Sequence, residues 1–152
     1  MIRVFRWFFA IILTIMDKTE RYLQDLKSGD PTTRADATKA LWVFWHRQAG
    51  AEMERELEEA TELMNPQQLD DALIALQSLV EKCPGFPEAH NKLATVLFLL
   101  DQYEESVAEC EEVLCQVPHH FGALNGMGMC LFELKRFEEA IRAFQKALEI
   151  QP

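Results

Sequence analysis

The sequence predicts an all-α fold: a right-handed α-solenoid of antiparallel helix pairs, preceded by two further helices and an apolar N-terminal segment. Three observations predict it. The 152 residues include only six glycines and six prolines among long stretches rich in Ala, Glu and Leu, which favours helices over a β-sandwich. Pro84, Pro118 and Pro152 lie 34 residues apart. Small and large side chains recur with the same period, which is typical of stacked helical hairpins.

The first element, residues 1–16, begins with Arg3 and Arg6 and continues as an uncharged, mostly apolar run, Trp7–Met16. A basic start before an apolar run of this length is the layout of a secretory signal. At roughly 1.5 Å per residue, a helix of all sixteen residues spans about 24 Å, which is less than the membrane core of about 30 Å. Three interpretations stay open: a signal-anchor or membrane-seated helix, a cleaved signal, or a segment that packs on the domain or follows a wrongly chosen start codon. We expect a membrane-associated, extracytoplasmic or organellar protein, with a cytoplasmic location as the alternative.

Residues 17–50 are predicted to form a two-helix N-terminal cap. The first helix ends before Gly29, a residue type that suits the position just past a helix. Asp30 followed by Pro31 is a start signal, an N-cap with proline at the first helical position, and it opens the second helix. The aromatic stretch at 41–45 is predicted to be buried between helices, with a recognition surface as the alternative.

Residues 51–152 are predicted to form three units, 51–84, 85–118 and 119–152, each a pair of antiparallel helices. Two such helices meet where side chains are small, because a larger side chain would push the backbones apart. One hairpin cannot cover its own apolar face, so neighbouring units must stack. The predicted repeat-packing residues are the small ones that recur with the period: Ala72, Ala94, Ser106, Gly128 and Ala140.

This pattern resembles that of tetratricopeptide repeats (TPR) over about two thirds of the chain. The third unit, from Leu124-Asn125-Gly126-Met127-Gly128 to Pro152, is close to the family consensus. The second is similar, with Ser106 in place of alanine and His90 where the family often has tryptophan, and the first is degenerate. The segments 90–95 and 119–124 resemble those of small TPR proteins that carry an N-terminal signal or anchor. His119 and His120 fall in the loop between units, where we expect surface histidines.

The resemblance implies a non-catalytic adaptor that binds a peptide or protein segment in a concave groove lined by the first helix of each unit. Asn91 and Asn125 lie one period apart and are predicted to hydrogen-bond an extended peptide, or else to cap or bridge helices. Phe98, Met129 and Phe132 are predicted to offer adaptable apolar contacts. The predicted groove residues are Leu57, Thr61, Asn91, Lys92, Thr95, Phe98, Asn125, Met129 and Phe132.

One TPR subgroup grips the terminal carboxylate of chaperone tails with a clamp of lysine, arginine and asparagine. The matching positions here are Leu57, Thr61, Lys92, Gly122 and Gly126. Cations are missing where the clamp needs them. The sequence therefore predicts against chaperone-tail binding.

Charge and chemistry exclude several other classes of function. The formal net charge of −10 makes the chain a poor nucleic-acid binder, and residues 51–118 hold only three basic against sixteen acidic residues. That run is interpreted as a solvated helical face, or as an acidic flank that attracts a basic partner. The four cysteines form no CxxC pair and are expected to be core thiols, with no metal and no cofactor. No catalytic motif is present, since Gly126-Met127-Gly128 lacks a third glycine and a preceding strand, so no enzyme activity is expected.

The last predicted helix carries an apolar stripe with no further helix in the sequence to cover it. Ile141, Phe144, Leu148 and Ile150 form this predicted oligomer face. Terminal repeats of solenoids need a polar outer face. The alternative function is therefore a structural or assembly subunit that forms a homo-oligomer or docks through this face. That the chain is part of a longer protein is also left open.

Overall fold

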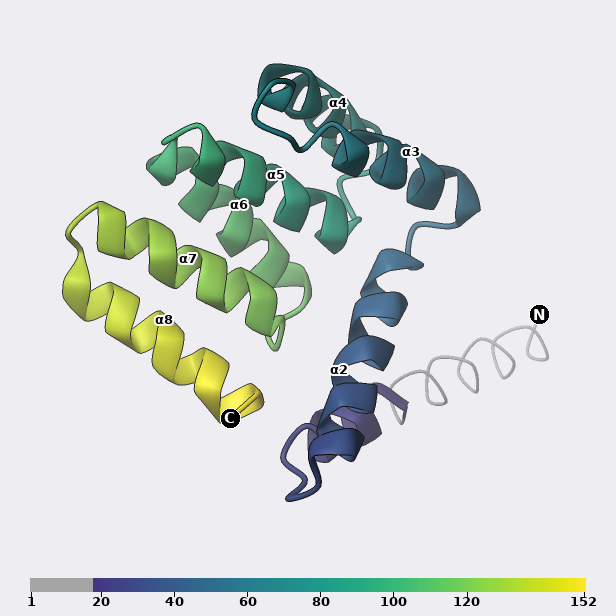
Figure 1. Cartoon of the computed structure of the whole chain (residues 1–152), viewed down its shortest axis with the longest axis vertical. Coiled ribbons are helices and arrows are strands. Elements are labelled where there is room, and N and C mark those ends of the chain that lie inside the picture. The colour runs from purple at the N-terminus through teal and green to yellow at the C-terminus, as the bar shows by residue number, and fades with distance from the viewer. Residues whose placement is uncertain (1–17) are drawn as a thin grey trace, which may run out of the picture. The chain divides into compact units, whose positions relative to one another are not determined.

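The computed structural model describes residues 18–152, and all regular secondary structure in that range is helical (Figure 1). The predicted all-α class is thereby confirmed. The predictions for residues 1–16 lie outside the described range. Within that range, no helix has the length and apolar character that a membrane crossing requires. The chain divides into two compact units, one that holds residues up to Phe44 and one that holds Trp45–Gln151.

The first compact unit contains a helix over 18–25 and most of α2, Pro31–His46. Asp30 caps α2 as predicted: its Oδ2 accepts hydrogen bonds from the Thr33 amide at 2.8 Å and the Thr33 hydroxyl at 2.7 Å. These bonds lower the pKa of the Asp30 carboxyl. Leu26, in the turn after the first helix, and Leu41, in α2, are both fully buried.

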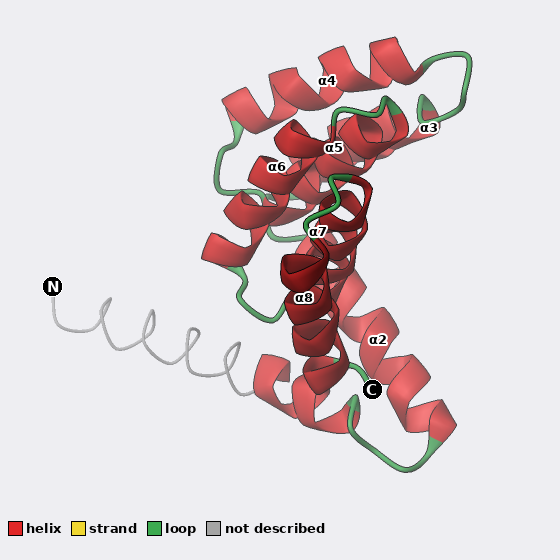
Figure 2. Ribbon diagram, turned by 90° about the vertical axis from the view of Figure 1, so that its left-hand side faces the viewer, coloured by secondary structure: helices red, strands yellow, loops and turns green. Residues whose placement is uncertain are grey.

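The second compact unit consists mainly of six consecutive helices. Each helix packs against the next one along the chain, and the first helices of the last two pairs, α5 and α7, also contact each other. Figures 1 and 2 show these helices stacked in order from α3 to α8. Their bounds are α3 Ala51–Glu62, α4 Leu69–Lys82, α5 Pro87–Leu99, α6 Tyr103–Gln116, α7 Phe121–Glu133 and α8 Phe137–Ile150.

The turns inside the helix pairs differ between repeats. Asp101 and Lys135 lie one period apart, and both adopt left-handed backbone geometry, with φ of 58° and 60°. The turns that hold them join α5 to α6 and α7 to α8 through three residues each, whereas six residues join α3 to α4. The second and third repeats therefore share a tight turn that the degenerate first repeat lacks.

The predicted repeat-packing residues are all buried. Gly128 shows why the position must be small, since a Cβ built on it would lie only 2.6 Å from the Phe144 ring. Ser106 uses its hydroxyl, which donates to the Ala94 carbonyl at 2.7 Å, so this polar residue is satisfied inside the hairpin of α5 and α6.

Candidate functional site

A pocket of about 110 Å³ opens between α5, α6 and α7, and its walls are mostly apolar. Four of the predicted groove residues line it, namely Asn91, Thr95, Phe98 and Met129. The remaining lining residues are small or sulfur-containing: Ala94, Ser106, Cys110, Gly122, Gly126 and Cys130. Three helices therefore contribute to one recess, and four of the nine predicted groove residues lie in its walls.

The recess exists because α7 presents glycines toward α6. Gly122 and Gly126 are four residues apart and share one face of the helix. A Cβ added at Gly126 would lie 3.6 Å from the Cys110 Sγ, an ordinary contact distance. Two of the positions that would hold cations in a carboxylate clamp are thus glycines that line the hollow.

The side chains of the predicted groove residues differ in their exposure. Phe132 and Met129 are about half exposed on α7, and Asn125 is exposed beside them. Thr61 and Lys92 are half-buried on α3 and α5. The predicted groove therefore keeps several accessible side chains along its first helices.

The structure corrects the prediction for Leu57. Its side chain is fully buried in a core cluster with Met53 and Ala60, so the prediction of a groove contact was wrong for this residue. The three residues follow helical spacing and form the buried stripe of α3. In the degenerate first repeat, the position that the clamp would use belongs to the core.

A buried polar network lies beside the pocket. Glu88 is fully buried near the start of α5, and its two oxygens accept hydrogen bonds from the Asn91 Nδ2 at 3.1 Å and the His120 Nε2 at 3.2 Å. The Ala123 amide donates to the His120 Nδ1 at 3.1 Å, so the ring hydrogen lies on Nε2. The carboxylate thereby holds Asn91 in a fixed orientation.

Trp45 packs on this network within the same compact unit. Its ring stacks on His120 with centroids 4.0 Å apart, and it lies 5.4 Å from the Phe121 ring. Trp45 and His120 are both fully buried. The expectation that His120 is a surface residue was wrong, because the end of α2 contributes an aromatic ring that covers it. The burial of Trp45 agrees with the prediction for the aromatic stretch.

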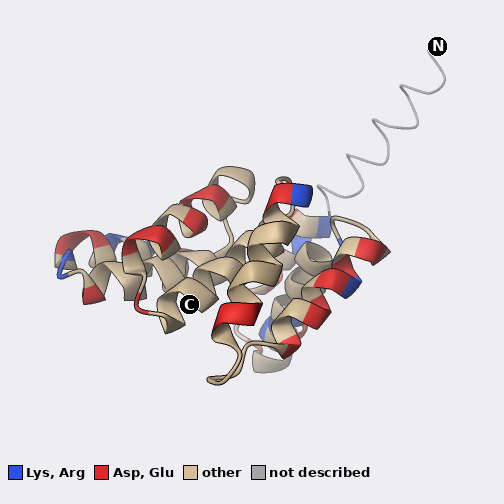
Figure 3. Cartoon of the chain, turned by 90° about the horizontal axis from the view of Figure 1, so that it is seen from above, with Lys and Arg blue, Asp and Glu red and all other residues tan. Residues whose placement is uncertain are grey.

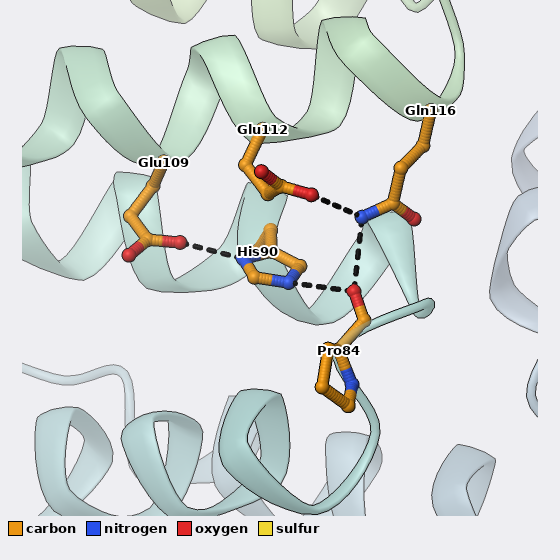
Figure 4. A network of polar contacts seen from close by, with 5 residues as sticks. All are labelled: Pro84, His90, Glu109, Glu112 and Gln116. Carbon is orange, nitrogen blue, oxygen red and sulfur yellow. Dashed lines mark hydrogen bonds and ion pairs between the residues drawn. The ribbon is translucent and has the colours of Figure 1, made fainter.

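A second polar network ties the second repeat to the end of the first repeat (Figure 4). The Glu109 Oε2 lies 2.6 Å from the His90 Nδ1, and the Pro84 carbonyl lies 3.0 Å from the Nε2. Gln116 also donates to Pro84, at 2.9 Å, and to Glu112. Burial lowers the pKa of His90, but the acceptors at both ring nitrogens and the charges of Glu109 and Glu112 outweigh it, so the pKa lies above its usual value.

The two buried cysteines that line the pocket are poor nucleophiles. Burial raises the pKa of the Cys110 thiol to about 12, and it also raises the pKa of Cys130, whose Sγ lies 3.1 Å from the Ser106 Oγ. Thiolate chemistry is therefore disfavoured here. In the part of the chain that the structure describes, no cluster of His, Cys, Asp and Glu is arranged to hold a metal ion.

Comparison with known proteins identifies the repeat. Models described as tetratricopeptide repeat match residues 57–118 and 122–152. The chain belongs to the tetratricopeptide repeat family. A TPR repeat-containing protein of Rhizobium etli is 26% identical over 126 residues, which are 83% of this chain and 62% of that relative. The chain thus spans less than two thirds of that relative's length.

Solved TPR structures share the fold. The first TPR of Spaghetti (RPAP3), bound to the HSP90 peptide SRMEEVD, is 19% identical with a TM-score of 0.64, over 66% of this chain and 79% of that one. The Sgt2 TPR domain from Aspergillus fumigatus is 18% identical with a TM-score of 0.62, over 65% and 66% of the two chains. A mutant form of MamA is 17% identical with a TM-score of 0.61, over 89% and 96%. The predicted α-solenoid is therefore confirmed.

Figure 3 shows that acidic residues are spread over many helical turns while basic residues are sparse, in keeping with 25 acidic against 15 basic residues. Among the residues that the structure describes, none of those that line the pocket carries a charge. The acidic surface and the neutral recess are therefore distinct features of the TPR region.

Proposed function

We propose that this TPR protein is a non-catalytic adaptor that binds a peptide or protein segment in the groove formed by α3, α5 and α7. The observation that carries the proposal is the pocket between α5, α6 and α7, which is lined by Asn91, Thr95, Phe98 and Met129. Such a recess, together with the exposed ring of Phe132 one helical turn after Met129 on α7, offers an extended segment both a pocket and an apolar contact surface.

Two comparisons support this proposal. Two structural neighbours, the first and second TPR of Spaghetti, are bound to an HSP90 peptide. Because they are 19% and 14% identical to this chain, they support the shape of the groove and not the identity of the ligand. Gly122 and Gly126 stand at positions that a carboxylate clamp fills with cations, which argues for a different ligand.

Photo-crosslinking in the cells of origin tests the proposal. A photoreactive amino acid at Met129, on the groove, is compared with one at Ala108, an exposed residue of α6. We expect the Met129 position to capture a defined protein and the Ala108 position not to. Capture that Phe132→Glu abolishes would support groove binding. Equal capture at both positions would contradict it.

The alternative is an assembly subunit that docks through α8. Ile141 and Leu148 are 55% and 61% exposed, which favours this function. Phe144 does not contribute fully to that face, because its ring packs against Gly128, and Ile150 is half-buried. Light scattering tests the proposal: a mass of two or more chains that Leu148→Asp reduces to one would support it, and a single-chain mass at high concentration would contradict it.

We also propose that residues 1–16 associate the protein with a membrane. Residues 17–50 would then act as the N-terminal cap, and residues 51–152 as the repeat region. The basic start and apolar run of the segment support the first part. Fractionation of cells that express residues 1–152 or 17–152 tests it. A membrane-bound full chain and a soluble shorter chain would support the anchor, whereas a soluble, uncleaved full chain would contradict it.

A further inference from the structure

We propose that the pocket binds one uncharged apolar side chain from an internal stretch of a peptide, while Asn91 accepts a hydrogen bond from the peptide N–H, and that the pocket rejects a terminal carboxylate. This inference rests on the proposed groove function and gives the chemistry of its partner. It makes Glu88 a positioning residue, because Glu88 decides which atom of Asn91 the groove presents.

The size of the pocket indicates a single side chain. Pockets for drug-sized ligands and cofactors measure about 300–1,000 Å³. This pocket measures about 110 Å³, and its walls include Ala94, Phe98, Gly126 and Met129. A leucine, methionine or phenylalanine side chain of a peptide matches both the size and the apolar lining. A flexible methionine wall can adapt to any of the three.

The orientation of Asn91 indicates a hydrogen-bond acceptor in the groove. Asn91 is 9% exposed, and its Nδ2 faces a carboxylate of Glu88, whose oxygens only accept. Glu88 therefore holds the Nδ2 of Asn91, and the Oδ1 is the polar atom of this side chain that is left for a ligand. This Oδ1 makes no hydrogen bond to any residue that the structure describes. The Oδ1 is not among the buried polar atoms without a partner, so it stays accessible and can accept a hydrogen bond from a peptide N–H.

The charges around the pocket disfavour an anion. The Glu88 carboxylate is fully buried behind Asn91, and it accepts hydrogen bonds from Asn91 and His120. The Ala123 amide, in the first turn of α7, donates its hydrogen bond to the His120 ring, so this amide is not available to a ligand. A terminal carboxylate in the pocket would find no cation among the described residues that line it, and the side chain behind Asn91 is the acidic Glu88.

Peptide display on the full-length chain tests the inference. Two random peptide libraries serve as probes. In one the random stretch ends in a free C-terminus, and in the other fixed sequence flanks the random stretch on both sides. We expect both libraries to enrich Leu, Met or Phe at one fixed position, with no preference for an acidic C-terminus. The HSP90 sequence SRMEEVD, as a synthetic peptide, should bind at least tenfold more weakly than a selected peptide.

Matched variants then test whether the pocket holds the apolar side chain of the peptide. Gly126→Leu fills the pocket from a position where a Cβ has ordinary space, and Ala108→Leu adds the same side chain to an exposed turn of α6. We expect the first to weaken the selected peptide about tenfold or more and the second to leave it unchanged, with both proteins showing a native melting transition. Replacing the peptide N–H that faces Asn91 by an ester oxygen should weaken binding about tenfold.

The outcomes separate the two proposals. Enrichment confined to free acidic C-termini would overturn this inference and leave groove binding in place. Internal apolar peptides that bind Gly126→Leu as well as the wild type would also overturn it. No enrichment in either library would overturn both the inference and the proposed function.

Discussion

Two surfaces of the repeat region expose apolar side chains, and they are built differently. The groove side holds a recess that α5, α6 and α7 enclose, with a buried carboxylate fixing the amide of Asn91 beside it. The α8 side presents Ile141 and Leu148 as exposed side chains on one helix. A recess with an oriented polar group can select its ligand, whereas a row of exposed residues supplies only apolar area. The difference favours the groove as the specific site.

The largest expected effect comes from the network behind the groove. Glu88→Ala should lower the free energy of unfolding by about 3 kcal/mol, because buried donors on Asn91 and His120 lose their acceptor. Denaturant unfolding of the variant and the wild type measures this change. Glu105→Ala, at an exposed position of α6, is the control and should change little. A loss below about 1 kcal/mol for Glu88→Ala would mean that the network does not stabilise the groove.

The next effect distinguishes two glycines of α7. Gly128→Ala should destabilise the protein by about 1–3 kcal/mol, because its Cβ would clash with Phe144. Gly126→Ala should stabilise it by about 0.5–1 kcal/mol, because alanine favours the helix and the pocket has space. Thermal and denaturant unfolding of the two variants checks the contrast. Equal effects would contradict the assignment of the pocket to the Gly126 side.

A smaller effect concerns pH. The pKa of His90 is raised in the folded chain, so its protonated ring contributes stability that is fully present below the unfolded pKa of about 6.5 and is lost as pH rises through the folded pKa. The difference in unfolding free energy between wild type and His90→Gln should therefore shrink as pH rises from about 5.5 to 8. Urea unfolding of both proteins across this range measures it. A difference that grows with pH would contradict the bonding to Glu109 and Pro84.

The smallest effect is expected on the α8 surface. Ile141→Ser and Leu148→Ser should each change the unfolding free energy by less than about 0.5 kcal/mol, because both side chains are mostly exposed. Unfolding measured at low protein concentration gives this value for the single chain. A loss of several kcal/mol at low concentration would contradict the exposure of these side chains in the single chain, and a loss found only at high concentration would favour the alternative function.

The repeat could be predicted from the sequence because its determinants are local and periodic. The residues that let helices approach, such as Ala94 and Gly128, recur every 34 residues, and the Asp30 cap precedes its helix directly. Size and spacing were sufficient for these features.

The site was only partly predictable. Asn91, Thr95, Phe98 and Met129 do share one recess. The burial of Glu88 could not be foreseen, because glutamate in the first turn of a helix is ordinarily exposed, and its acceptor role depends on His120, 32 residues away. The resemblance to the family places Leu57 in the groove, whereas the apolar stripe that it forms with Met53 and Ala60 on α3 indicates the core.

The most direct test of groove recognition is calorimetric titration of one ligand, a partner captured at Met129 or a selected peptide, into three full-length chains. These are the wild type, Gly126→Leu, and the double variant Ile141→Asp with Leu148→Asp. We predict that Gly126→Leu weakens binding about tenfold or more while the double variant binds as the wild type does. Binding that survives Gly126→Leu and is lost in the double variant would contradict groove recognition and assign the interaction to α8.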